Sequence, residues 1–234
     1  AQDFTPARTR LHNQQLQVVT SGGEVLPLTD PRVTVLIASM GKYASEAFAA
    51  TLKGLGFHAR ANPPSDENVL KVGHGNTLCK ECLPLILTTG TLLNYINNGK
   101  RADEALVYFF ASSSGPCRFG QYAIFMEDLI RRRRIPDVAI FSLSAENSYL
   151  GLGADFERRT WWAGVVSDVM EDARSMLLAN AQDPQAAMEV FHRQWGHILG
   201  ELEKGRYRSL ERQLAASADE LARIPLKRPV ADVP

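Results

Sequence analysis

The chain has 234 residues, of which 45% are hydrophobic and 22% are charged, and this predicts a globular protein with a full core in one large domain or two small ones. Its 26 basic and 26 acidic side chains balance, so the sequence has no broad excess of positive charge that would favour binding to nucleic acid or an anionic membrane. No stretch approaches about 18 uninterrupted apolar residues, and the first thirty residues lack the pattern of a signal peptide. We therefore expect a cytoplasmic protein with no nucleic-acid or membrane partner.

The first segment, residues 1–31, shows little apolar periodicity and is predicted to be an N-terminal extension. The chain begins with Ala1 rather than Met. We expect a processed product or a piece of a longer polypeptide.

The second segment, residues 32–155, is predicted to be an α/β domain. Apolar runs typical of buried strands alternate with stretches of helical spacing. The expected strands cover 33–38, 56–61, 105–111 and 138–143, and the expected helices cover 44–55, 66–72, 84–99 and 117–133. This alternation predicts a three-layer, Rossmann-like fold with a parallel sheet of about four strands, in which ligands bind beyond the carboxyl ends of the strands.

The third segment, residues 156–224, is predicted to be a helical appendage. Three amphipathic stretches follow one another, with breaks at Asp183-Pro184 and at Gly205, and they cover about 156–181, 184–203 and 206–223. We expect the tryptophans and Phe191 of this segment to pack it against the sheet. The last residues, 225–234, are predicted to form a flexible tail.

The three cysteines are the most informative feature of the sequence. Cys79 and Cys82 form a C-x-x-C pair followed by Pro84, and Cys117 follows Pro116. Because proline is tolerated at the first helical position, both prolines indicate helix starts, with Cys82 just before one helix and Cys117 just inside the other. The positive end of a helix dipole stabilises thiolates and anionic metal–thiolate sites.

These thiols favour metal or redox chemistry over a structural disulfide framework. Three soft ligands that meet at one point suit a [4Fe-4S] cluster with one iron left open. Zinc held by the three thiolates and His74 is the main metal alternative. A redox disulfide between Cys79 and Cys82 is the remaining one.

Polar residues that follow the expected strands are candidates for contacts to a cofactor. Arg118 and Gln121 lie a turn apart at the start of the expected helix 117–133, where a guanidinium offsets cluster charge, holds an anionic group or pairs with a nearby carboxylate. Ser114 either donates to cluster sulfides or satisfies carbonyl groups at the strand end. Glu146 and Asn147 either bind at the same edge or form a local turn.

Two cysteine segments and a later loop resemble a known superfamily. The segments are Gly75 to Pro84, Ser114 to Tyr122 (Ser-Gly-Pro-Cys-Arg-Phe-Gly-Gln-Tyr) and Ser144 to Asn147 (Ser-Ala-Glu-Asn). They resemble the 2-hydroxyacyl-CoA dehydratase / benzoyl-CoA reductase superfamily, most closely the dehydratase-like region of its large activase-fused members. The resemblance covers residues 32–153 well and the C-terminal helices only loosely.

The resemblance implies iron–sulfur clusters in Rossmann-like domains, reduced one electron at a time by an ATP-dependent activator and used on a CoA thioester. Carried over to this chain, the cluster ligands are Cys79, Cys82 and Cys117. The sequence shows no phosphate-binding glycine loop, since Gly73-His74-Gly75 lacks the rest of either nucleotide motif. The ATPase is therefore expected elsewhere, on other domains of a longer chain or on a separate protein.

Three hypotheses follow for the function. The first is an iron–sulfur protein that acts in low-potential electron transfer, or in radical reduction or dehydration of a CoA thioester, as part of a larger chain or complex. The second is a non-catalytic docking module with a zinc site or no metal, and the third is a thiol–disulfide redox module. The sequence names no catalytic residue or acyl group, and it leaves the oligomeric state open.

Overall fold

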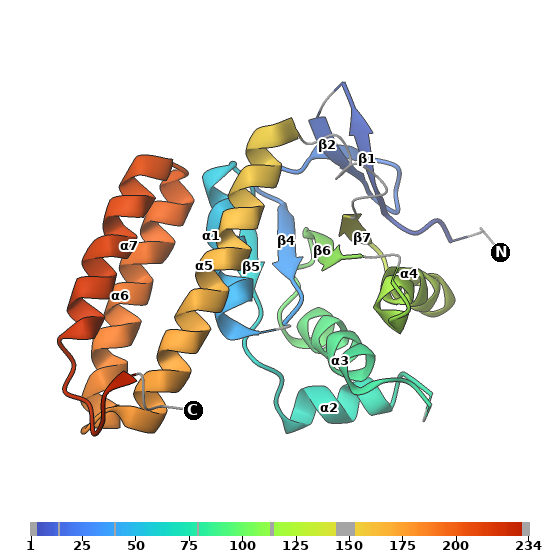
Figure 1. Cartoon of the computed structure of the whole chain (residues 1–234). Helices are drawn as coiled ribbons and strands as arrows, with labels where there is room; N and C mark the ends of the chain where they lie inside the picture. The colour runs from blue at the N-terminus through green and yellow to red at the C-terminus, as the bar shows by residue number, and fades with distance from the viewer. Residues whose placement is uncertain are drawn as a thin grey trace.

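A parallel sheet forms the centre of the computed structural model, which describes residues 4–13, 15–39, 41–78, 80–112, 115–143 and 153–230. Its strands are β4 (Val33–Ile37), β5 (Ala59–Ala61), β6 (Ala105–Ala111) and β7 (Val138–Leu143), in the spatial order β5-β4-β6-β7 (Figure 1). Every neighbouring pair is parallel. The predicted α/β fold class, with a Rossmann-like three-layer arrangement, is confirmed.

Helices connect the strands of this sheet. The connections are α1 (Lys42–Gly54) between β4 and β5, α2 (Glu67–His74) and α3 (Leu83–Asn98) between β5 and β6, and the 3-10 turn η1 (Arg118–Gln121) with α4 (Tyr122–Arg133) between β6 and β7. α3 and α4 cover one face of the sheet. Alternate strand residues such as Leu36, Tyr108 and Ile140 pack there among their apolar side chains, which is why β6 and β7 have continuous apolar sequences.

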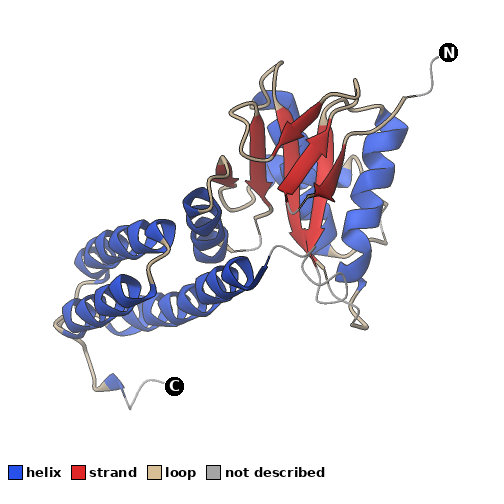
Figure 2. Cartoon of the chain, turned by 90° about the horizontal axis from the view of Figure 1, so that it is seen from above, coloured by secondary structure: helices blue, strands red, loops and turns tan. Residues whose placement is uncertain are grey.

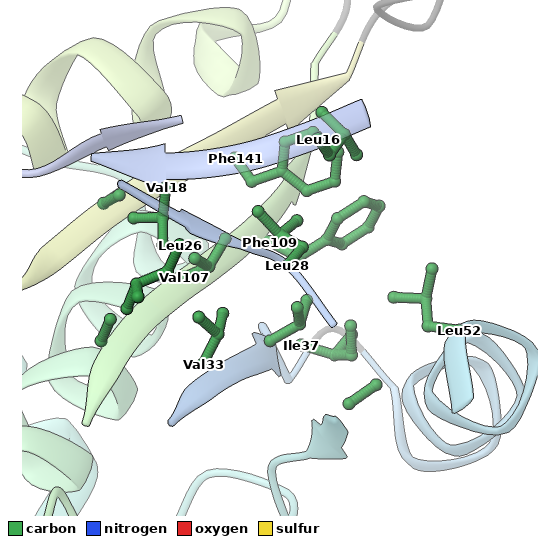
Figure 3. Packing of buried hydrophobic residues seen from close by; sticks show 14 of the residues in the cluster. Leu16, Val18, Leu26, Leu28, Val33, Ile37, Leu52, Val107, Phe109 and Phe141 are labelled. Carbon is green, nitrogen blue, oxygen red and sulfur yellow. The ribbon is translucent and has the colours of Figure 1, made fainter. Parts of the chain in front are cut away.

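The opposite face is covered in part by a second, smaller sheet that the sequence did not predict. Its antiparallel strands are β1 (Arg8–His12), β2 (Gln15–Val19) and β3 (Val25–Pro27), in the order β1-β2-β3. Leu16, Val18 and Leu26 point from it toward Val107 and Phe141 of the parallel sheet (Figure 3). The segment 1–31 therefore includes a layer of the core.

Two polar contacts fix this small sheet at β7. The Ser21 backbone N–H donates to the Asp137 carboxylate at 2.9 Å, and the Asp137 N–H donates to the Ser21 hydroxyl at 3.0 Å. The Thr9 hydroxyl donates to the Ile140 carbonyl at 3.2 Å. The N-terminal segment is thus tied to the last strand of the parallel sheet.

The helical appendage consists of α5 (Gly153–Asn180), α6 (Pro184–Lys204) and α7 (Tyr207–Ala222), which lie to one side of the sheet (Figure 2). The predicted breaks are observed: the Asp183 carboxylate caps α6 by accepting from the Ala186 N–H at 3.0 Å, and Gly205 ends α6 with φ +65°. No helix among the described residues combines the length and apolarity needed to cross a membrane.

The appendage packs mainly on α1, and Phe156 at the start of α5 joins the apolar cluster of the sheet; Phe191 and Trp195 pack on α1, which corrects the sequence-based expectation for them. Tyr43 of α1 makes edge contacts with Phe191 and Trp195, and the Trp195 indole N–H donates to Glu46 at 2.6 Å. Trp161, expected in this contact, is 74% exposed. The sequence pattern of α5 did not distinguish its faces, because apolar residues occur all around it.

Candidate functional site

The predicted ligand-binding edge lies where the parallel strands end. In the register, Ile37 of β4 is paired with Phe109 of β6, which is paired with Phe141 of β7, so these strands finish at one edge. The chain passes from β4 to β5 on one side of β4 and then crosses to β6 on the other side. The strand order therefore reverses between β4 and β6. Open parallel sheets bind ligands at such a switch point.

Cys82 lies at this edge as the N-cap residue of α3. Its backbone is extended (φ −71°, ψ 148°), and its carbonyl accepts from the N–H groups of Leu85 at 3.0 Å and Ile86 at 3.2 Å. Pro84 occupies the first turn, as its position predicted. The half-buried Cys82 side chain packs against the apolar cluster that contains Ala38, at the end of β4. Because Leu85 and Ile86 donate to the Cys82 carbonyl and Pro84 has no N–H, the positive end of the α3 dipole, and not a cap hydrogen bond, favours an anionic thiol here.

Cys117 also lies at the start of a helical segment, but one residue outside it. The sequence placed Cys117 just inside a helix that starts at Pro116, whereas the structure makes it the extended N-cap (ψ 136°) of η1. The α-helix begins only at Tyr122. Gly120 falls in this first turn, where its low helix propensity favours a short 3-10 segment. The Cys117 side chain is exposed.

Tyr122 brings the two described cysteines into one environment. Its hydroxyl lies 2.6 Å from the Cys82 sulfur in a hydrogen bond that either group can donate. Burial raises the pKa of Tyr122 well above its usual value, and the hydrogen bond to Cys82 and the charges of Cys82 and Cys117 raise it further. Tyr122 thus contacts Cys82 directly, and it begins the helix that follows the η1 turn capped by Cys117.

Aromatic contacts hold the Tyr122 ring in place. Phe110, at the end of β6, and Phe119, in η1, meet it edge to face with ring centroids 6.5 and 5.2 Å away. The sequence pattern alone predicted no role for Tyr122. The feature that could have indicated one is its position five residues after Cys117, at the first turn of a helix that starts at the sheet edge.

The Cys82 segment is fixed by a tight hairpin of α2 and α3. A Cβ atom added at Gly73 would lie 2.1 Å from the Ile86 carbonyl oxygen, and one added at Gly90 would lie 2.0 Å from the Val69 carbonyl oxygen. Only glycine permits this approach of two helix backbones. The Asp66 carboxylate caps α2 by accepting from the Val69 N–H at 2.8 Å. The hairpin therefore sets where its connecting segment reaches the sheet edge.

The connecting segment between α2 and α3 is also hydrogen-bonded to its own helix. The Asn76 amide donates to the Val72 carbonyl at 2.6 Å, and the Thr77 hydroxyl donates to the Gly73 carbonyl at 3.0 Å. Farther on, Leu78 and Leu83 are 70% and 55% exposed. Apolar side chains thus flank the cysteine pair on the surface.

Arg118 and Gln121 begin and end η1, directly after Cys117, and both are exposed. Arg118 forms no ion pair with any described residue, so the alternative of a structural carboxylate partner finds no support in that part of the chain. His74 is the last residue of α2 and is exposed, where the sequence indicated a loop residue.

Four of the predicted site residues lie outside the described residues, namely Cys79, Ser114, Glu146 and Asn147. Within the described ranges, no three His, Cys, Asp or Glu side chains come together as a metal-binding group. The described donors that fit a soft metal are the thiols of Cys82 and Cys117, placed at two helix starts beside one phenol.

Comparison with known proteins adds no relative: no protein-family model matches the chain, and no curated protein or solved structure matches it.

Proposed function

We propose that this chain binds a [4Fe-4S] cluster through Cys79, Cys82 and Cys117. The observation that supports the proposal is that Cys82 and Cys117 are the N-cap residues of α3 and η1, with the Cys82 sulfur hydrogen-bonded to Tyr122 at the start of α4. Cys79 precedes Cys82 by three residues, which is the spacing of common cluster motifs. A bound cluster would supply one-electron chemistry.

The role proposed for the chain's own residues is to hold and tune this group. Cys82 and Cys117 occupy the N-cap positions of α3 and η1, where the positive end of the α3 dipole lowers the energy of an anionic site. The Tyr122 hydroxyl hydrogen-bonds the Cys82 sulfur, and hydrogen bonds to ligand sulfurs raise a cluster's potential. The Phe110 and Phe119 rings exclude water from one side of that hydroxyl.

We propose that the reaction is low-potential electron transfer, or radical reduction or dehydration of a CoA thioester, with an ATP-dependent activator. The support for this is the resemblance of the cysteine segments to the dehydratase superfamily. Arg118 adds an exposed guanidinium beside Cys117, without a carboxylate partner among the described residues, where it can hold an anionic group of a substrate. Gln121 offers an amide at the same turn.

A protein partner or a further domain covers the site in this proposal. Leu78 and Leu83 are exposed beside the cysteine pair, and large apolar side chains in such a place favour contact with another surface. The electron donor must reach the same edge, so the activator is the partner that this position suits. The cytoplasm, where thiols stay reduced, is the compartment that suits this chemistry.

The test is anaerobic reconstitution of the full chain with iron and sulfide, followed by EPR spectroscopy after dithionite reduction. We expect a reduced-cluster signal in the wild type and its loss in each of Cys79→Ser, Cys82→Ser and Cys117→Ser. Ser112→Ala, which changes a polar residue at the end of β6 without removing a thiol, is the control that keeps the signal.

Two results would contradict the proposal. A colourless protein that takes up zinc and not iron would favour the docking module. A reversible Cys79–Cys82 disulfide couple that persists in Cys117→Ser, with no EPR signal in any variant, would favour the thiol–disulfide module. Circular dichroism of each variant establishes whether a lost signal reflects a lost ligand or a lost fold.

A further inference from the structure

A second candidate site lies at the opposite, amino edge of the parallel sheet. A cavity of about 510 Å³ opens there between the end of α1, the first residues of β4 and β5, and the end of α3. We call it the amino-edge pocket. Its volume is in the range of small-molecule sites, which occupy about 300 to 1,000 Å³.

The lining of the amino-edge pocket is basic. Lys53, His58, Arg60 and Arg101 contribute to it from α1, the α1–β5 turn, β5 and the α3–β6 connection, and no Asp or Glu is among its lining residues. Balanced charge over the whole chain makes this local excess of cations notable. Cations in a concave site raise the local concentration of anions.

Two of these cations have no ionic partner among the described residues, namely Lys53 and Arg60. The Arg60 guanidinium lies over the Tyr95 ring, 5.5 Å from its centroid, which orients it at the wall of the cavity. Arg101 is held at the rim by Asp103 at 3.4 Å and Glu104 at 3.9 Å. Lys53 and Arg60 therefore present positive charge with no acidic partner among the described residues, whereas Arg101 is already paired.

Two acidic groups that interact with lining residues, Glu104 and Asp30, are each held by hydrogen bonds. Glu104 is buried, and it accepts from the Tyr95 hydroxyl at 3.0 Å and from the Arg101 backbone N–H at 3.1 Å. Asp30, which interacts with His58, is bound by the Arg32 guanidinium at 3.1 Å. Neither carboxylate is free to enter the pocket.

We propose that the amino-edge pocket binds a small molecule that bears a diphosphate group. Two unpaired cations, Lys53 and Arg60, with the paired Arg101 at the rim, suit the two to three negative charges of a diphosphate at neutral pH. Guanidinium groups bind phosphate oxygens through paired N–H donors. This site is independent of the cysteines and of the function proposed for them.

The test is isothermal titration calorimetry of the full chain with pyrophosphate, ADP and inorganic phosphate at low ionic strength. We expect one pyrophosphate per chain and weaker binding of inorganic phosphate. Lys53→Gln/Arg60→Gln should weaken pyrophosphate at least about a hundredfold, because each lost charged hydrogen bond costs about tenfold or more in affinity. Both side chains are exposed, so the variant should fold like the wild type.

The matched control is Arg131→Gln/Arg133→Gln, which removes two exposed cations at the end of α4. It should bind pyrophosphate like the wild type. ADP that binds more tightly than pyrophosphate would identify a nucleotide, and equal affinities would identify the diphosphate alone as the recognised group. The proposal is overturned if neither ligand binds the wild type, if inorganic phosphate binds as well as pyrophosphate, or if both double variants lose affinity equally.

Discussion

The two edges of the parallel sheet present different chemistry on one scaffold. At the carboxyl edge, Cys82 and Cys117 lie at helix starts beside the buried phenol of Tyr122. At the amino edge, Lys53 and Arg60 line an open pocket with no acidic residue in its walls. Soft thiols suit a metal group, whereas exposed cations suit a hard anion. The sheet thus separates a candidate electron-transfer site from a candidate anion site.

The strongest test of this separation substitutes the candidate site residues of one edge at a time. Cys82→Ser/Cys117→Ser should abolish cluster uptake and leave pyrophosphate affinity within about twofold of the wild type, because the substituted residues lie at the far edge of the sheet. Lys53→Gln/Arg60→Gln should do the reverse. Iron analysis and calorimetry on the same preparations measure both effects. Loss of both functions in either variant would show that the two edges form one site.

A substitution where α2 and α3 approach closely should destabilise the packing that positions the carboxyl edge. Gly90→Ala places a Cβ atom 2.0 Å from the Val69 carbonyl oxygen, so the helices must move apart. We expect the free energy of unfolding to fall by about 1 to 3 kcal/mol, the usual cost of overpacking, as measured by chemical denaturation.

The control for the hairpin variant is Gly164→Ala on α5, where an added Cβ meets no atom within 4 Å. Alanine has the higher helix propensity, so this variant should be at least as stable as the wild type. Equal destabilisation of both variants would show that the close approach of α2 and α3 is not what limits substitution at Gly90.

A smaller effect is expected from removing the hydroxyl of a buried tyrosine, and it should differ between Tyr122 and Tyr95. Tyr122→Phe removes the hydroxyl beside Cys82 and keeps the ring, so the unfolding free energy should fall by about 1 kcal/mol. In the reconstituted protein it should also shift the reduction potential to more negative values, because one hydrogen bond to a ligand sulfur is lost. Protein-film voltammetry measures this shift.

Tyr95→Phe is the matched variant for this comparison. It removes the hydroxyl that donates to the buried Glu104 at 3.0 Å, near the amino-edge pocket. It should destabilise the protein without moving the potential, since the change lies far from the thiols. Similar potentials for the wild type and Tyr122→Phe would mean that the phenol does not tune the site.

The smallest effect is expected at alkaline pH. Burial raises the pKa of Tyr122, Tyr95, Tyr43 and Tyr108 above the ordinary value of about 10. Above pH 10 the unfolded chain therefore loses tyrosine protons that the folded chain keeps, so stability is full below pH 10 and falls as pH rises toward the folded values. Urea denaturation at pH 9 and pH 11 measures the decline, which should be shallower in Tyr122→Phe. An equal slope in both proteins would contradict the assignment for Tyr122.

The carboxyl edge could be largely predicted from the sequence because its signals are local. The continuous apolar runs of β6 and β7 gave both strands with their observed bounds, and Pro84 and Gly99 marked the limits of α3. Cys82 and Cys117 were then placed at helix starts next to a strand end. The role of Tyr122 was missed because its contact with Cys82 depends on how α4 lies against α3, which no local pattern encodes.

The N-terminal sheet and the amino-edge pocket could not be predicted for a related reason. β1 is mostly polar and exposed, with the sequence Arg-Thr-Arg-Leu-His, and β3 has only three residues, so neither gives a strong strand signal. The pocket cations Lys53, Arg60 and Arg101 come from different elements and meet only after the sheet has formed. Each, taken alone in the sequence, is an ordinary surface charge.

The central claim is that the thiols at the carboxyl edge hold an iron–sulfur cluster. The most direct measurement is the iron and acid-labile sulfide content per chain after anaerobic reconstitution, beside the triple variant Cys79→Ser/Cys82→Ser/Cys117→Ser. If the cluster is bound, we expect about four irons and about four sulfides per chain in the wild type and close to none in the variant. Zinc or no metal in the wild type, with a fold that is indifferent to the three substitutions, would contradict it.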